Sequence, residues 1–184
     1  ADLFLQVRIN GDVPLLKAIM LLMLEEEQKN PGSIFDHSFI ASHTSGYDAF
    51  IRQLQTQPFD ACVEACGVPE PKIREAAAMI MKHNKVIICW AMGLTQHMNA
   101  VDNIKEIVNL LLLKGSIGKP GAGACPVRGH SNVQGDRTMG IWEMPPQSLL
   151  NGLEKVFHFN PPQHHGYDTV NAIKAMHAGA AKVF

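Results

Sequence analysis

The sequence predicts an α/β fold that is rich in helix and has few, short parallel strands. Most of the chain carries apolar residues at helical spacing, as in residues 70–83, where Ile73, Ala77 and Ile80 lie on one stripe. Residues 85–91 form a different pattern: a short, continuous run of β-branched and apolar residues between turn signals. Such a run is typical of a parallel strand that is buried on both faces.

The N-terminal part is expected to begin with a strand over residues 3–9, in which apolar and polar residues alternate. A helix over residues 13–29 follows, with Asp12 as its N-cap and Pro14 in its first turn. This helix is apolar nearly all round in its first half, which indicates burial. Further helices are expected over residues 36–41, 47–55, 60–66, 70–83, 100–114 and 169–178.

The glycine-rich segment over residues 115–140 is predicted to be a loop that recognises a ligand. Residues 121–140 contain five glycines, two arginines, a histidine, an asparagine and a glutamine. Glycines let a backbone approach a ligand closely, and polar side chains require partners when they are buried. Residues 141–162 hold four prolines and are expected to be irregular, and a strand is expected to begin at residues 181–184.

Two domains are expected, with residues 1–127 forming a partial α/β domain and residues 128–184 beginning a second α/β segment. The loop after the predicted strand, residues 92–96, is a second candidate for ligand binding. In open α/β sheets, ligands bind at the carboxyl ends of the strands.

The composition excludes several classes of protein. The 184 residues carry a formal net charge of −1 and show no basic stripe, so a nucleic acid is not an expected partner. The longest apolar run, residues 18–24, is far shorter than the roughly 20 residues of a membrane span. No signal-peptide pattern precedes it, so we expect a cytoplasmic protein. The four cysteines are interpreted as packed thiols of a reducing compartment rather than as a metal site or disulfides.

The common nucleotide and zinc motifs are absent. Gly118, Gly121 and Gly123 follow a helix rather than a strand, and their spacing differs from the dinucleotide fingerprint. Pro120 stands where a phosphate-binding loop needs Ser or Thr. Nine histidines are present, but no zinc-binding spacing is found.

Arg128 and His130 are the candidate catalytic residues. Arg128 lies between Val127 and Gly129, and its guanidinium offers five donors suited to a phosphate, a carboxylate or an oxo group. His130 follows two residues later, on the same side of an extended segment, so the two form a charged pair able to handle a proton. The alternative is an internal ion pair between Arg128 and a carboxylate such as Asp136.

Three blocks of sequence resemble the molybdopterin oxidoreductases of the dimethyl sulfoxide reductase superfamily, and most closely their formate dehydrogenase-like alpha subunits. Residues 9–12, before a helix, resemble the segment that contacts the guanine end of a pterin dinucleotide. Residues 90–96 resemble the family's tryptophan–glycine–methionine–glycine loop. Residues 118–123 and 126–135 look like the loop beside the pterins and the metal, and residues 165–167 fit the same frame.

The resemblance implies a portion of the pterin-binding α/β domains of a larger enzyme. Its cofactor would be a bis-molybdopterin guanine dinucleotide holding molybdenum or tungsten, and its partners a small-molecule substrate and an electron-transfer protein. Arg128 would correspond to the arginine near the metal. The residues implied in cofactor binding are Asn10, Gly11, Asp12, Met92, Gly93, Gln96, Arg128, Gly129, Asn132 and Gln134.

The chain also departs from the family pattern. His130 stands where characterised formate dehydrogenases of this type carry Gln, so the resemblance does not extend to formate as the substrate. Ala91 replaces a glycine of the second block. The 4Fe–4S cysteines and the ligand of the metal would lie before residue 1, so the chain by itself is expected to hold part of a site and to be inactive.

Two other functional classes fit the same residues. One is a small α/β module that binds a nucleotide or an anion at the Arg128 loop and has a regulatory role. The other is a structural or adaptor domain, which is disfavoured because long loops in compact domains are usually functional.

Overall fold

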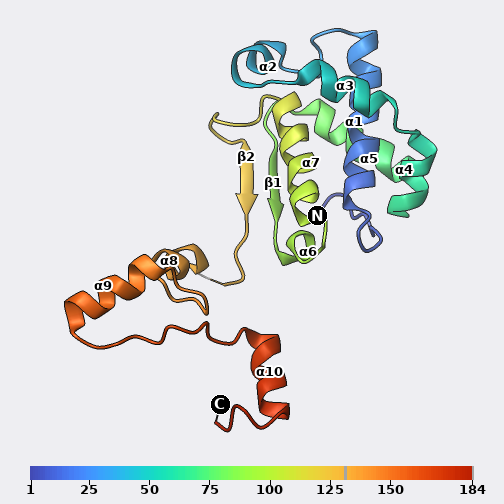
Figure 1. The fold of residues 1–184 in the computed structure, drawn as a ribbon. Helices are drawn as coiled ribbons and strands as arrows, with labels where there is room; N and C mark the ends of the chain where they lie inside the picture. The colour runs from blue at the N-terminus through green and yellow to red at the C-terminus, as the bar shows by residue number, and fades with distance from the viewer. Residues whose placement is uncertain (131, 184) are drawn as a thin grey trace. The chain divides into compact units, whose positions relative to one another are not determined.

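The computed structural model describes residues 1–130 and 132–183 and divides the chain into two compact units, Ala1–Gly129 and His130–Phe184. The order of elements in unit 1 is five helices, a strand, two helices and a second strand, as labelled in Figure 1. The bounds are α1 Asp12–Lys29, α2 His37–His43, α3 Tyr47–Gln55, α4 Phe59–Cys66, α5 Glu70–Lys82, β1 Ile87–Trp90, α6 Met92–Thr95, α7 Ala100–Leu113 and β2 Gly123–Pro126.

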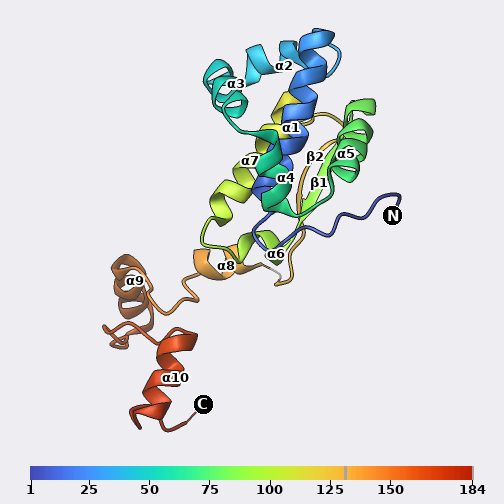
Figure 2. The ribbon, with the colours of Figure 1, turned by 90° about the vertical axis from the view of Figure 1, so that its right-hand side faces the viewer.

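The core of unit 1 is built around α1. This helix packs against α3, α4, α5 and α7, and Figures 1 and 2 show it in the middle of the helical group. The sequence of α1 is apolar on nearly every side in its first half, and this pattern predicts that the helix is buried. The side chains that it buries are Ala18, Ile19, Met20, Leu22, Met23, Leu24 and Glu27.

The sheet has two parallel strands, β1 and β2, paired with Cys89 opposite Cys125 and Trp90 opposite Pro126. The helix α7 connects them and packs against both. The predicted α/β class is therefore confirmed, with a helix-rich body and short parallel strands. The expectation of burial on both faces of β1 is wrong for the described residues, because exposed and half-buried positions alternate along it. Ile88, on the half-buried side of β1, packs against the core of unit 1.

No strand forms over residues 3–9, which corrects the prediction for the N-terminal segment. The alternation there is nevertheless real, since Leu3, Leu5 and Val7 pack against the core while the residues between them are exposed. A strand also requires a ladder of backbone hydrogen bonds to a neighbouring strand. In the described chain this segment is held instead by isolated hydrogen bonds, such as the one from the Arg8 N–H to the Cys66 carbonyl at 2.9 Å.

Two segments expected to be irregular contain regular structure. The glycine-rich segment includes β2 and the short helix α8, Val133–Thr138, and the segment over residues 141–162 contains α9, Gln147–Phe157. The prolines at 145 and 146 directly precede α9, where proline is tolerated because the first N–H groups of a helix lack intrahelical partners. The loop after β1 likewise holds a single helical turn, α6.

The second unit consists of α8, α9 and α10, Thr169–His177. Asp168 caps α10, since its Oδ1 accepts the N–H of Asn171 at 2.7 Å. The guanidinium of Arg137 lies 5.1 Å from the centre of the Trp142 ring. Residues 181–183 form no strand, and Phe184 lies outside the described residues.

Glu27 is a buried carboxylate that fixes the turn between α1 and α2. It accepts backbone N–H groups of Gly32, Ile34 and Phe35, and its Oε1 lies 2.7 Å from the His37 ring. Burial raises the pKa of Glu27, but these hydrogen bonds outweigh it and lower the pKa to about 2.

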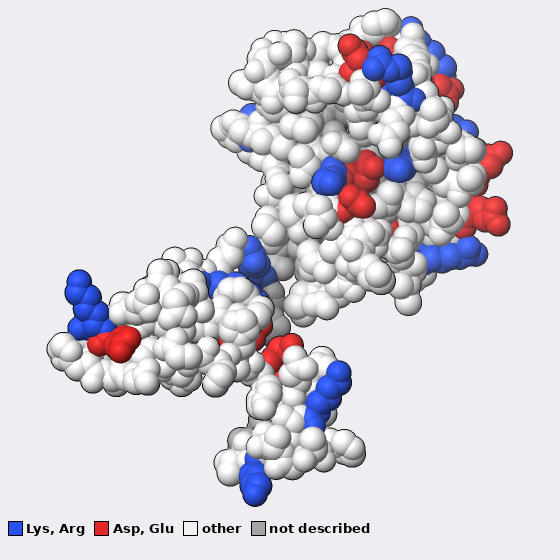
Figure 3. Space-filling view, in the orientation of Figure 1, with Lys and Arg blue, Asp and Glu red and all other residues white. Residues whose placement is uncertain are grey.

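Charges of both signs are interspersed on the face shown in Figure 3. Among the described residues, no helix is long and apolar enough to cross a membrane.

Candidate functional site

The parallel pairing of β1 and β2 brings two of the predicted site segments to one edge of the sheet. The strands end at Trp90 and Pro126, which are register partners, and the N–H of Val127 continues the ladder to the Trp90 carbonyl at 2.7 Å. The helix α6 follows β1, and Arg128 follows β2. Both therefore begin at the same edge of the sheet.

Contact between these segments is visible at Gly129. A Cβ added at Gly129 would lie 3.6 Å from Met92 Cε, which is ordinary van der Waals contact. One turn further on, Gln96 Nε2 lies 4.0 Å from the Met92 sulfur. Met92, Gln96, Arg128 and Gly129 are thus grouped at the carboxyl edge of the sheet.

Gly93 leaves this edge open. A Cβ at Gly93 would meet no atom within 4 Å, so the backbone of α6 is accessible to a flat ligand from that side. Arg128 is exposed and lies two residues beyond Pro126, the end of β2. Its guanidinium at this position is suited to binding an anion.

The start of α1 carries the third predicted segment. Gly11 is the N-cap residue of α1 and Asp12 its first helical residue, and no side chain caps the helix, which corrects the expectation of an Asp12 cap. The carboxylate of Asp12 in the first turn still complements the helix dipole. The start of α1, α6 and the start of α7 lie at the same end of unit 1 in Figures 1 and 2.

The turn over residues 10–12 is held against the end of α4. Asn10 has a left-handed backbone with φ of 63°. A Cβ at Gly11 would come within 2.9 Å of the Cys66 Cα, so only glycine fits there. Arg8 Nη1 donates to the Glu64 carbonyl at 2.8 Å, which fastens the turn from the other side. The support of this segment by the end of α4 is a feature that only the structure shows.

The remaining predicted residues lie in the second unit. His130 is its first residue and is exposed. Asn132 precedes α8 in a left-handed conformation, with φ of 56°, and its side chain occupies the space that a Cβ at Gly135 would take. Gln134 belongs to the first turn of α8. Each unit therefore presents its own set of predicted residues.

Sequence reasoning missed Asn103, a buried amide that holds α6 in place. Asn103 is fully buried on α7, donates to the Leu94 carbonyl at 2.9 Å and accepts from Asn99 Nδ2 at 3.2 Å. The sequence contains a signal for it, since Asn103 lies four residues before Ile107 on the apolar stripe of its helix. A polar residue on a core face requires an internal partner, and here that partner is the backbone of α6.

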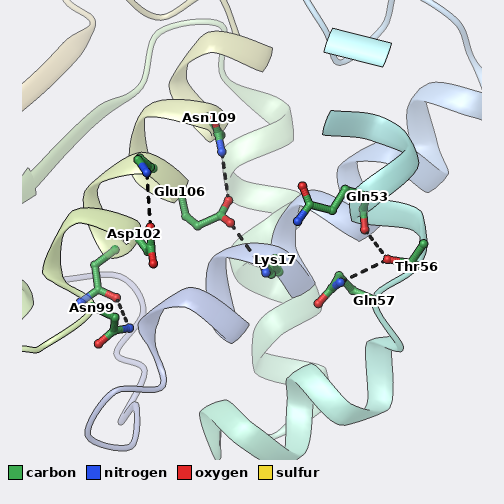
Figure 4. Close-up of polar contacts among 10 residues, drawn as sticks. Lys17, Gln53, Thr56, Gln57, Asn99, Asp102, Glu106 and Asn109 are labelled. Carbon is green, nitrogen blue, oxygen red and sulfur yellow. Dashed lines mark hydrogen bonds and ion pairs between the residues drawn. The ribbon is translucent and has the colours of Figure 1, made fainter. Parts of the chain in front are cut away.

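A polar groove lies beside this support, between α1, α3 and α7 (Figure 4). Its volume is about 460 Å³. In the groove, Lys17 Nζ lies 3.8 Å from Glu106 Oε1, and Asn109 Nδ2 donates to Glu106 Oε2 at 3.2 Å. Because its acidic and basic groups pair with each other, the groove contributes to the packing of α1 on α7.

The chain is similar in sequence to proteins that are named oxidoreductases. No family model matches it. An uncharacterised oxidoreductase of Mycobacterium tuberculosis is 50% identical over 184 residues, 100% of this chain and 24% of that protein. The protein YdeP of Escherichia coli is 40% identical over 99% of this chain and 24% of its own length. A Staphylococcus aureus protein provisionally named a formate dehydrogenase is 30% identical over 97% of this chain and 18% of its own length.

A solved structure shares the fold. Acetylene hydratase from Pelobacter acetylenicus matches with a TM-score of 0.58 and 23% identity, over 66% of this chain and 16% of that chain. The chain spans 24% of the length of the first curated relatives that it matches. The chain is thus similar in sequence to proteins named oxidoreductases and to one provisionally named a formate dehydrogenase, and it shares its fold with part of acetylene hydratase.

Proposed function

We propose that the chain forms part of the binding site for a bis-molybdopterin guanine dinucleotide in a formate dehydrogenase-like oxidoreductase. The observation that carries the proposal is the parallel pair β1–β2, which brings α6 and Arg128 to one edge of the sheet. In open α/β sheets this edge is where ligands bind. The names of the relatives, oxidoreductase and formate dehydrogenase, support the same class of reaction.

The residues at this edge fit a large, flat and polar ligand. The open side of Gly93 admits a ring close to the backbone, and the side chain of Gln96 offers both a donor and an acceptor. The Asp12 carboxylate at the start of α1 is suited to accept N–H groups of a guanine. Asn132 and Gln134 add two further amides in the second unit.

When bound, the cofactor supplies the redox chemistry through its molybdenum or tungsten ion. Arg128 would bind an anionic substrate through its planar set of donors and stabilise negative charge that develops beside it. His130 would accept or release a proton at its ring nitrogen. Residues 10–12 would orient the guanine end, with their own position fixed by the end of α4.

The complete enzyme is proposed to need more than this chain. A 4Fe–4S cluster and the ligand of the metal are implied by the family and are not assigned to these residues. We therefore expect the isolated 184 residues to show no turnover.

The test is the Arg128→Ala variant of the complete enzyme. Loss of a positioned charge at a reacting centre costs about 100- to 1,000-fold in turnover, so turnover per bound pterin should fall by that factor. Arg52→Ala is the matched control, because Arg52 is an exposed arginine on α3. Turnover of Arg128→Ala at the wild-type rate would refute the catalytic role, and wild-type enzyme without pterin would refute the cofactor.

A further inference from the structure

Two cysteines from distant parts of the sequence are register partners in the sheet. Cys89 of β1 stands directly opposite Cys125 of β2. In neighbouring strands, register partners point to the same face, so the two thiols share one face of the sheet. Ile88, the neighbour of Cys89 on the opposite face, packs against the core of unit 1, whereas both cysteines are exposed.

The register makes the two thiols neighbours across the ladder. The Cys125 side chain beside it raises the pKa of the Cys89 thiol. This neighbourhood needs no rearrangement of the strands, because the register already sets it. The interpretation of all four cysteines as packed thiols is thus wrong for this pair among the described residues, while Cys62 and Cys66 are buried as expected.

The geometry favours an ion between the sulfurs over a direct bond. Parallel strands lie about 4.8 Å apart and their Cβ bonds run side by side, whereas a disulfide requires Cβ atoms about 3.5–4.5 Å apart. The described residues contain no group of three or more side chains able to hold a metal. Zinc requires about four ligands, so a pair of cysteines does not satisfy it.

We propose that Cys89 and Cys125 form a two-thiolate site for a soft, thiophilic cation, copper(I), on the exposed face of the β1–β2 sheet. Thiolate ligands select copper(I) among the biological metals, and this ion accepts two sulfur ligands. Binding releases one proton from each thiol and forms two copper–sulfur bonds. Copper remains in the +1 state, so no oxidant or reductant takes part.

The site is separate from the proposed cofactor edge. Cys89 and Cys125 each precede the last residue of their strand, and the candidate cofactor residues follow the strands. Loss of the copper site is therefore expected to leave the pterin content unchanged, so the two proposals can fail independently.

The experiment is an anaerobic titration of the complete protein with copper(I) supplied by a chromophoric chelator. The wild type should take up one copper ion more per chain than Cys89→Ala or Cys125→Ala, measured by the absorbance of the chelator complex. Cys62→Ala is the matched control, because this thiol is buried on α4, and it should keep the extra ion. Equal uptake by the wild type and both strand variants would overturn the proposal.

Two further measurements keep the result interpretable. Circular dichroism should show the same helix content and melting behaviour for the wild type and the three variants. X-ray absorption at the copper edge should show two sulfur neighbours in the wild type. A disulfide between Cys89 and Cys125 in the protein as isolated would contradict the spacing argument and overturn the site.

Discussion

Glu27 shows how much a single buried side chain contributes to this fold. Its carboxylate replaces water with hydrogen bonds from three backbone N–H groups and lies against His37. The helical spacing of the sequence places Glu27 after a run of buried apolar residues but does not identify its partners. Those partners come from the turn after α1, so the role of this carboxylate is decided by the tertiary fold.

Glu27 also gives a pH dependence of stability with a defined sign. Its pKa is near 4.5 in the unfolded chain and about 2 in the folded chain, so its contribution is present above pH 4.5 and is lost as the pH falls toward 2. We expect Glu27→Gln to lower the free energy of unfolding by about 2–3 kcal/mol at pH 7 and by much less near pH 2.

Urea unfolding at both pH values measures this difference. Glu25→Gln is the control, because Glu25 is exposed and pairs with Lys29 on its own helix. That pair is worth about 0.3–0.5 kcal/mol. A loss for Glu27→Gln that is the same at both pH values would contradict the linkage.

At the scale of elements, the helices follow the sequence closely and the irregular segments do not. The predicted bounds of α3 match the observed ones, and those of α5 and α7 differ by one residue. These helices carry continuous apolar stripes, and such a stripe can be recognised from neighbouring residues alone. The sequence does not predict α9, because the prolines at 145 and 146 indicate irregular structure, whereas in the fold they directly precede the first residue of this helix. β2 was missed because its ladder partner, β1, lies more than 30 residues earlier.

Asn103 gives a prediction about how α7 holds α6. Asn103→Ala removes the donor to the Leu94 carbonyl, and an unpaired buried polar group costs about 1–3 kcal/mol. We expect the free energy of unfolding to fall by that amount and amide exchange over residues 92–96 to accelerate. Hydrogen exchange followed by mass spectrometry measures the second effect.

Asn109→Ala is the matched control on the same helix, because Asn109 is half-buried and bonds to a side chain. It should cost less than about 1 kcal/mol and leave exchange in α6 unchanged. Unchanged exchange in Asn103→Ala would show that α6 is held by other contacts.

At the scale of the whole molecule, the two units differ in the number of buried apolar side chains that they contain. The main apolar cluster lies entirely in unit 1 and surrounds α1. Among the described residues of unit 2, the buried apolar side chains are Leu150, Pro161 and Ala175, while Phe157, Val170 and Ile173 are exposed. Units of about 60 residues or fewer are marginally stable even with a good core.

We therefore expect residues 1–129 to fold alone and residues 130–184 to remain largely unfolded. The first piece should show a single cooperative transition in urea by circular dichroism, because it contains the core. The second should show low helicity and no transition. A cooperative transition of residues 130–184 alone would contradict this prediction.

The sequence by itself determined the helix-rich α/β class, the strand near residues 85–91, the burial of α1 and the segments that resemble the pterin-binding family. These features depend on local periodicity and on short motifs, which can be recognised without knowledge of the tertiary structure. Only the tertiary structure decided that Cys89 faces Cys125, that Asn103 supports α6, and that the turn at Gly11 rests on α4. Each of these depends on contacts between residues far apart in the chain, which periodicity along the sequence does not encode.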